Sequence, residues 1–218
     1  MSNSDDKHIL TTGLQLGVMN KSIKTDDLTF DEQYSSTTGD FDESAFSGEN
    51  FQTNSLYKFD VNWGIFYKFN PPGKKYHPYA GFAISHISLP GQNFTEERDV
   101  MPIQWKFNLG TEWDINDNIR ITPGILYMYQ KSATEFIIKT NLIYHLSNEN
   151  YDIRANLGYR LKDALIIGLG MRCKDFIVTM SYDYNISYLN NYTGGNGGFE
   201  ISISYQGAFK IIQNKSSI

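Results

Sequence analysis

The segment IQWKFNLGTEW, residues 103–113, alternates between two kinds of side chain along its whole length. One set contains Ile103, Trp105, Phe107, Leu109, Thr111 and Trp113, and the other contains Gln104, Lys106, Asn108, Gly110 and Glu112. A period of two places successive side chains on opposite faces of a β-strand. The segment is therefore predicted to be a strand with one apolar and one polar face.

The same period recurs along most of the chain, as in YDIRANLGYRL (residues 151–161) and FIVTMSYDYNI (residues 176–186). It predicts an all-β fold with about ten strands. Their expected ranges are 8–19, 56–69, 76–87, 101–113, 119–130, 135–146, 150–161, 164–173, 175–186 and 199–206.

Strand length and connection length both favour a membrane barrel. Most predicted strands have about 10 to 13 residues, whereas strands of globular proteins typically have about 5 or 6 and tilted membrane-spanning strands about 9 to 11. Short connections such as 70–75, 116–118 and 147–150 alternate with the longer segments 20–55, 88–100 and 187–198. Outer-membrane barrels have short periplasmic turns and longer outer loops. The prediction is an antiparallel up-and-down transmembrane β-barrel, with both chain ends on the periplasmic side.

The charged residues fall on the polar faces of these strands. In a membrane barrel the apolar rings, including Trp105, Phe107, Tyr182 and Tyr184, would face lipid. The charges would line the lumen, and we expect Arg154 and Arg160 to pair there with Asp183 and Glu200. A soluble barrel with the faces reversed has the same alternation, so the period alone does not separate the two cases.

Composition excludes several classes of protein. The chain has 218 residues, is 40% hydrophobic and carries a net charge of -5. None of its apolar runs approaches the roughly 18 residues of a membrane-spanning helix. Its single cysteine, Cys173, rules out an internal disulfide framework. Its first residues are polar and do not resemble a signal peptide.

Residues that could carry chemistry do not form a catalytic set, and no enzyme is predicted. The histidines His8, His77, His86 and His145 share no metal-ligand spacing. GLGMRCKD (168–175) lacks the third glycine of a dinucleotide loop and is better interpreted as strand. GDFDES (39–44) has carboxylates but not the twelve-residue pattern of a calcium loop. We therefore expect no metal and no cofactor.

The segment 20–55 is a long outer loop that is acidic and rich in aromatic residues. Loops of this length are usually functional or disordered. Exposed rings can anchor a protein partner, so two interpretations remain open, partner binding and disorder. The candidate contact residues are Phe30, Tyr34, Phe41, Phe46 and Phe51.

Four stretches, taken in order, resemble the PorP/SprF family of outer-membrane proteins. They are LQLGVMNKSIKTDDLTFDEQY (14–34), YAGFAISHISLPGQNF (79–94), GYRLKDALIIGLGMR (158–172) and SYDYNISYLNNYTGGNGGFEISISY (181–205). The last is the most specific, because its Ser-Tyr-Asp and its glycine-rich lead into Phe199 resemble the closing hairpin of the family. The similarity extends over nearly the whole chain.

This resemblance implies a component of the type IX secretion system of Bacteroidetes, which exports proteins and, in gliding members, delivers surface adhesins. It implies an integral outer-membrane barrel without catalytic residues, acting with other secretion-system proteins, exported cargo and lipid, but not nucleic acid. The residues carried over are Tyr159, Arg160, Asp163, Ser181, Tyr182, Asp183, Ser187 and Glu200. Their alternative role is only to close and order the barrel.

The chain departs from the family at its front, where members have a signal peptide and further strands. We therefore expect residues 1–218 to form one domain, the C-terminal part of a larger barrel, with residues 207–218 as a periplasmic tail. Two rival functions remain: a passive porin-like or ligand-binding barrel of another family, and a soluble β-sandwich or adhesin domain.

Overall fold

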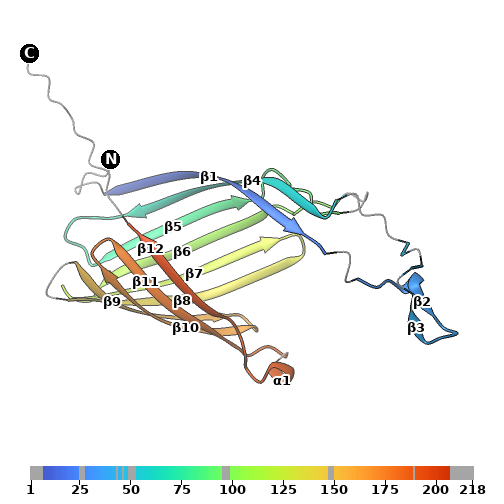
Figure 1. The fold of residues 1–218 in the computed structure, drawn as a ribbon. Helices are drawn as coiled ribbons and strands as arrows, with labels where there is room; N and C mark the ends of the chain where they lie inside the picture. Colours follow the sequence, from blue (N-terminus) through green and yellow to red (C-terminus); the bar gives the residue numbers. More distant parts are fainter. Residues whose placement is uncertain are drawn as a thin grey trace, which may run out of the picture.

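A computed structural model describes residues 7–24, 28–42, 44–45, 47–48, 53–94, 99–146, 150–188 and 190–206. Ten strands form a single sheet in chain order, each hydrogen-bonded to the next (Figure 1). They are β1 (His8–Ser22), β4 (Ser55–Phe69), β5 (Tyr76–Ser85), β6 (Gln104–Asp114), β7 (Ile119–Gln130), β8 (Ala133–His145), β9 (Tyr151–Arg160), β10 (Ala164–Cys173), β11 (Phe176–Asn185) and β12 (Phe199–Tyr205).

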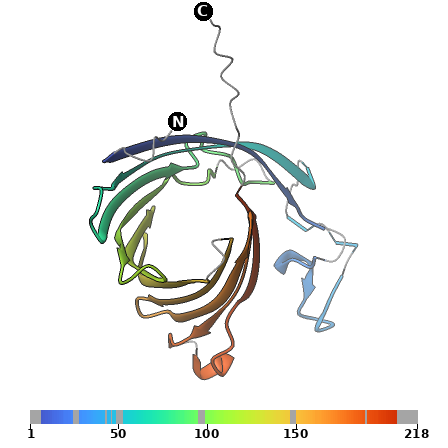
Figure 2. The same ribbon diagram turned by 90° about the vertical axis from the view of Figure 1, so that its left-hand side faces the viewer.

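Every neighbouring pair of strands is antiparallel, so the sheet is a simple up-and-down meander. The prediction of an all-β, ten-stranded, up-and-down architecture is confirmed. Figure 2 shows the sheet curling round a central space, with β12 returning toward β1. Within the described residues, β1 pairs only with β4 and β12 only with β11. No helix in the described part of the chain is long and apolar enough to span a membrane.

The connections divide the sheet into two ends. At one end, called here the turn end, β4 and β5, β6 and β7, β8 and β9, and β10 and β11 are joined by connections of a few residues. At the other, the loop end, three long connections follow β1, β5 and β11. The helix α1 (Asn190–Thr193) lies in the last of these.

Among the strand boundaries that differ from the prediction, which include the end of β1 at Ser22 and the start of β8 at Ala133, two have a visible local cause. β5 ends at Ser85 because His86 adopts a positive φ of 63°, and its backbone N–H donates to Asn62 Oδ1 at 3.0 Å. β6 begins at Gln104 rather than at residue 101. The carbonyl of Pro102 instead accepts a hydrogen bond from the side chain of Gln130 at 2.9 Å.

The polar face of the sheet is its concave, inner face. Ion pairs on this face reach across an intervening strand: Lys68 on β4 lies 2.8 Å from Glu112 on β6, and Arg160 on β9 lies 2.9 Å from Asp183 on β11. Neighbouring strands lie about 4.8 Å apart, so such contacts require side chains that converge, as they do inside a curled sheet.

The outer face is a continuous apolar surface. Phe82 packs against Trp105 and Phe107 on the next strand, with ring centroids 5.9 and 5.0 Å apart, and Phe107 continues the row to Tyr127 at 6.3 Å. Phe107, although mid-strand, is 44% exposed. The predicted facing, with rings outside and charges inside, is confirmed.

Candidate functional site

An arm of chain between β1 and β4 projects beyond the loop end of the sheet (Figure 1). It contains a short 3-10 helix, η1 (Asp31–Gln33), and a two-stranded hairpin of β2 (Tyr34–Ser35) and β3 (Asp40–Phe41). The sequence predicts a long outer loop over residues 20–55 and does not predict these elements within it.

Gln33 organises the described part of the arm and is its buried polar residue. Its side-chain Oε1 accepts a hydrogen bond from the N–H of Phe30 at 3.0 Å, and its Nε2 donates to the carbonyl of Ala45 at 3.0 Å. Its own carbonyl accepts the N–H of Asp42 at 2.9 Å. Through its side chain and its backbone carbonyl, this one residue is bonded to three points of the loop, which favours an ordered arm.

The aromatic residues of the arm include an exposed pair. Tyr34 and Phe41 face each other across the hairpin in an edge-to-face contact of 5.3 Å, and they remain 50% and 43% exposed. Phe30 is half-buried beside Gln33. The predicted contacts Phe46 and Phe51 lie outside the described residues.

The arm is strongly acidic. Residues 25–52 contain eight carboxylates and no lysine, arginine or histidine. Among the described acids, Asp42 accepts hydrogen bonds from the N–H and hydroxyl of Ser44. These bonds hold the pKa of the Asp42 carboxyl below its usual value. The surface presented by the arm therefore combines negative charge with two exposed rings.

A second feature of the loop end is a cluster centred on Arg160, which we call the Arg160 cluster. Its guanidinium contacts Glu135 at 2.9 Å, Asp163 at 3.1 Å and Asp183 at 2.9 Å. The carbonyl of Asp163 accepts the N–H groups of Ile186 and Ser187 at 2.9 and 3.1 Å. The cluster ties the turn after β9 to the chain leaving β11, and it brings together four of the carried-over residues: Arg160, Asp163, Asp183 and Ser187.

The other carried-over residues lie near this cluster or one strand away. The hydroxyl of Tyr159 accepts the N–H of Lys162 at 3.4 Å, and that of Tyr182 accepts the N–H of Gly197 at 3.2 Å. Ser181 and Glu200 lie opposite each other on β11 and β12.

The predicted pairing of inner arginines is correct in part. Arg160 pairs with Asp183 as expected, but Arg154 pairs with Asp152, at 3.3 Å. Glu200 has no ion pair with a described cation, and the expectation that it joins the charge ladder is wrong. The physical reason is position, because the neighbour of Glu200 on β11 is Ser181 and the arginines lie on other strands.

Sequence reasoning missed a cluster at the turn end, called here the Asp152 cluster. Asp152 is 1% exposed. Its carboxylate contacts His145 at 2.7 Å, Arg172 at 2.7 Å and Arg154 at 3.3 Å. His145 and Arg172 are its direct cross-strand neighbours on β8 and β10. The alternation of the sequence places these residues on the polar faces of their strands. The strand register that brings them together cannot be read from the sequence.

Further charges extend the inner lining along the turn end. Arg120 contacts both Glu112 and Asp114, Glu112 also pairs with Lys68, and Asp114 lies 3.2 Å from His77. These ion pairs connect strands β4 to β7 on the inner face of the sheet.

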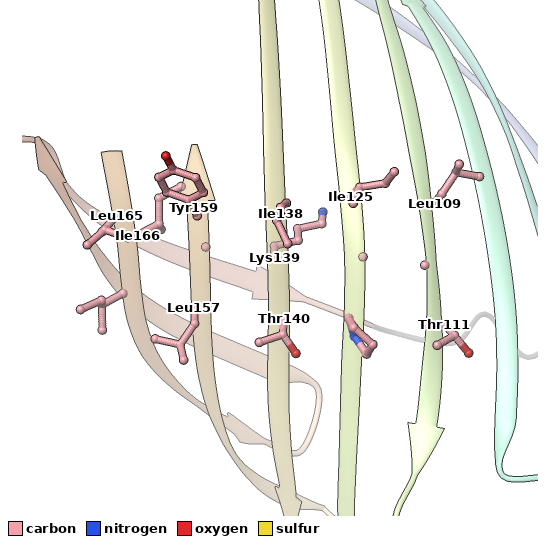
Figure 3. A pocket seen from close by; sticks show the side chains of 15 residues that line it. Leu109, Thr111, Ile125, Ile138, Lys139, Thr140, Leu157, Tyr159, Leu165 and Ile166 are labelled. Carbon is pink, nitrogen blue, oxygen red and sulfur yellow. The ribbon is translucent and has the colours of Figure 1, made fainter. Parts of the chain in front are cut away.

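The outer face carries a shallow apolar groove that crosses β6 to β10 (Figure 3). Its volume is 850 Å³, and its sides include Leu109, Ile138 and Leu165. On the inner side of the same wall, the hydroxyl of Tyr79 lies against Gly110 and Gly124, where side chains would otherwise stand. The glycines thus allow a tyrosine to lie flat against the inside of the wall.

Metal and cofactor chemistry was not expected from the sequence. Among the described residues, no group of three His, Cys, Asp or Glu side chains is arranged to hold a metal ion. His77, His86 and His145 each lie beside one aspartate, at 3.2, 3.1 and 2.7 Å. GLGMRC forms the end of β10, as the strand interpretation predicted, and Cys173 is its last residue.

A ten-stranded antiparallel sheet with an apolar outer face and paired charges inside is typical of membrane proteins that cross with strands. The chain is a membrane protein of the type IX secretion system. It belongs to the PorP/SprF family, since the family model described as type IX secretion system membrane protein PorP/SprF matches residues 3–205. This family is a component of a secretion system and not a known family of enzymes. No curated protein matches the chain.

Proposed function

We propose that this protein is an outer-membrane β-barrel component of the type IX machinery that assists export of cargo, including surface adhesins in gliding members, by binding other proteins. Catalysis has no part in this proposal. The observation that carries it is the projecting arm, which combines local order with exposed aromatic rings at one end of a membrane-type sheet.

The outer-membrane location is supported by the two faces of the sheet. Apolar side chains on the outer face, such as Leu157 and Ile167, are each 56% exposed, as expected of side chains that meet acyl chains. Backbone groups in lipid must be paired, so the outer edges of β1 and β12 need partners in the membrane. The two strands run in opposite directions, and pairing with each other would supply antiparallel partners.

The arm is suited to protein binding. Binding hot spots are enriched in aromatic residues that become desolvated in the complex. The edge-to-face pair of Tyr34 and Phe41 is already held in place by its hairpin, so little side-chain freedom is lost on binding. The partners supported by the family are other proteins of the secretion system and the exported cargo.

The test replaces the two rings of the arm. A Tyr34→Ala, Phe41→Ala double variant, made in the complete protein in its native cell, is expected to lower surface delivery of cargo at least fivefold while the level of barrel in the outer membrane is unchanged. A matched control replaces Tyr188 and Tyr192, which are 82% and 88% exposed in the connection between β11 and β12.

Cargo at the cell surface and barrel in the outer membrane are quantified in parallel. Normal export by the arm variant at a normal barrel level would exclude the arm as the contact surface. Reduced export by the control variant alone would move the site to the β11–β12 connection.

A further inference from the structure

The inner wall contains a recess beneath β1, β4 and β5. Gly13, Gly64 and Gly81 form part of its floor, and its volume is 410 Å³. A Cβ atom added at Gly13 would meet no atom within 4 Å, so the space above this glycine is open. Ligand pockets typically have volumes of about 300 to 1,000 Å³, and the recess falls within that range.

Apolar side chains form most of the boundary. Phe66 lies over Gly81, where its ring carbon would be 3.3 Å from an added Cβ atom, and Leu126 closes the recess from β7. The recess offers a place for an aliphatic side chain of moderate size.

Two polar side chains that lack an ion-pair or hydrogen-bond partner among the described residues border the same recess. Lys106 and Asn108 lie two residues apart on the inner face of β6, and both line the recess. Lys106 has no ion pair with any described carboxylate. Asn108 Oδ1 is buried and accepts no hydrogen bond from the described residues. A buried acceptor without a donor is unfavourable, so a ligand that donates a hydrogen bond to this oxygen is favoured.

We propose that the recess binds an apolar amino-acid residue that has a free α-carboxylate and an amide N–H. The carboxylate pairs with Lys106, the N–H donates to Asn108 Oδ1, and the side chain enters the recess against Phe66 and Leu126. Both an N-acylated amino acid and the C-terminal residue of a peptide have this chemistry.

A second inner lysine shows that an unpaired cation alone does not make this site. Lys139, on β8, also has no ion pair with a described carboxylate and points to the inner face. Its direct neighbours are Gly124 and Gly158. The inner side of Gly124 is covered by the Tyr79 hydroxyl and that of Gly158 by Ile166. Lys139 is therefore the matched control for Lys106.

The experiment measures binding of N-acetyl-L-leucine to the protein in lipid nanodiscs by saturation-transfer NMR. Saturable binding is expected for the wild-type protein, with a dissociation constant at least tenfold higher for Lys106→Met and unchanged within twofold for Lys139→Met. Gly13→Leu, which fills open space without a clash, is expected to abolish binding.

Two analogues test the assignment of each polar contact. N-acetyl-leucinamide lacks the carboxylate and 4-methylpentanoate lacks the N–H, and each is expected to bind at least tenfold more weakly. A hexapeptide ending in leucine is compared with its C-terminal amide. If the free-acid peptide binds with the affinity of N-acetyl-L-leucine, the natural ligand is the C-terminus of a peptide. If the peptide does not bind, the natural ligand is a free N-acyl amino acid. Absent saturable binding, equal affinity for the leucinamide, or equal effects of the two lysine variants would overturn the proposal.

Discussion

The two ends of the sheet distribute charge in different ways. At the turn end, Asp152 is almost completely buried, and its partners come from three strands. At the loop end, residues 25–52 contain eight carboxylates and no lysine, arginine or histidine, and the rings of Tyr34 and Phe41 are exposed. The turn end thus contains a buried ion-pair cluster, whereas the arm at the loop end presents exposed acidic groups and rings.

The largest expected effect comes from breaking the Asp152 cluster. Asp152→Asn preserves shape but removes the charge that His145, Arg154 and Arg172 surround. Removing one partner of a buried ion pair costs about 3–5 kcal/mol, so unfolding in lipid vesicles should shift by that amount. Asp163→Asn is the control at the loop end, where the side chain is 52% exposed and a loss below about 1 kcal/mol is expected. Equal losses at the two sites would remove the distinction between the ends.

A charge placed on the outer face should have the next largest effect. Phe107→Arg puts a cation into the apolar surface and is expected to cost roughly 2–4 kcal/mol near the middle of the membrane. Ser202→Arg places the same side chain on the inner face of β12 and should cost much less. The two variants are compared by equilibrium unfolding in vesicles, and a larger loss for Ser202→Arg would reverse the assignment of the faces.

Tight packing inside the wall predicts a smaller loss at Gly110. A Cβ atom there would lie 2.7 Å from the carbonyl oxygen of Pro123 and closer still to Tyr79. Gly110→Ala should therefore cost about 1–3 kcal/mol through overpacking. Gly17→Ala, where nothing lies within 4 Å, should change the free energy of unfolding by no more than about 0.5 kcal/mol. Thermal unfolding in lipid separates the two, and similar values would show that the wall relaxes around Gly110.

The smallest effect concerns the arm at low pH. Hydrogen bonds from Ser44 lower the pKa of the Asp42 carboxyl. The stabilisation that these bonds give to the arm is therefore complete above the ordinary pKa of 3.8 and is lost as the pH falls through the lowered pKa. The amide resonance of Ser44 should titrate with a midpoint below 3.8, and Ser44→Ala should raise the midpoint of Asp42. A wild-type midpoint above 3.8 would contradict the hydrogen bonds of the arm.

The strands could be predicted from the sequence because side-chain parity alone determines which residues share a face. The alternation in residues 103–113 predicted the strand β6 and placed Phe107 on its apolar face, but it did not show whether that face lies outside or inside the curled sheet. The Asp152 cluster could not be predicted in the same way, since His145 and Arg172 meet Asp152 only through the register of two turns. The Arg160 cluster was predicted in part, because the family resemblance indicated several of its residues but not the contacts between them.

The arm shows a different limit of sequence reasoning. Its two-residue strands are too short to have a period, and they depend on hydrogen bonds that the side chain of Gln33 makes with Phe30 and Ala45. Local polar contacts of this kind leave no repeating pattern. The sequence therefore indicated that the loop was exceptional without indicating how it is ordered.

We infer that the outer face of this sheet meets lipid and that its inner face meets water. Spin labels are placed one at a time at residues 104–109, in a Cys173→Ser background and in bilayers, to test this facing. Collision with oxygen should be highest at 105, 107 and 109, and collision with a water-soluble nickel chelate should be highest at 104, 106 and 108. Accessibility without a period of two, or with the two sets exchanged, would contradict it.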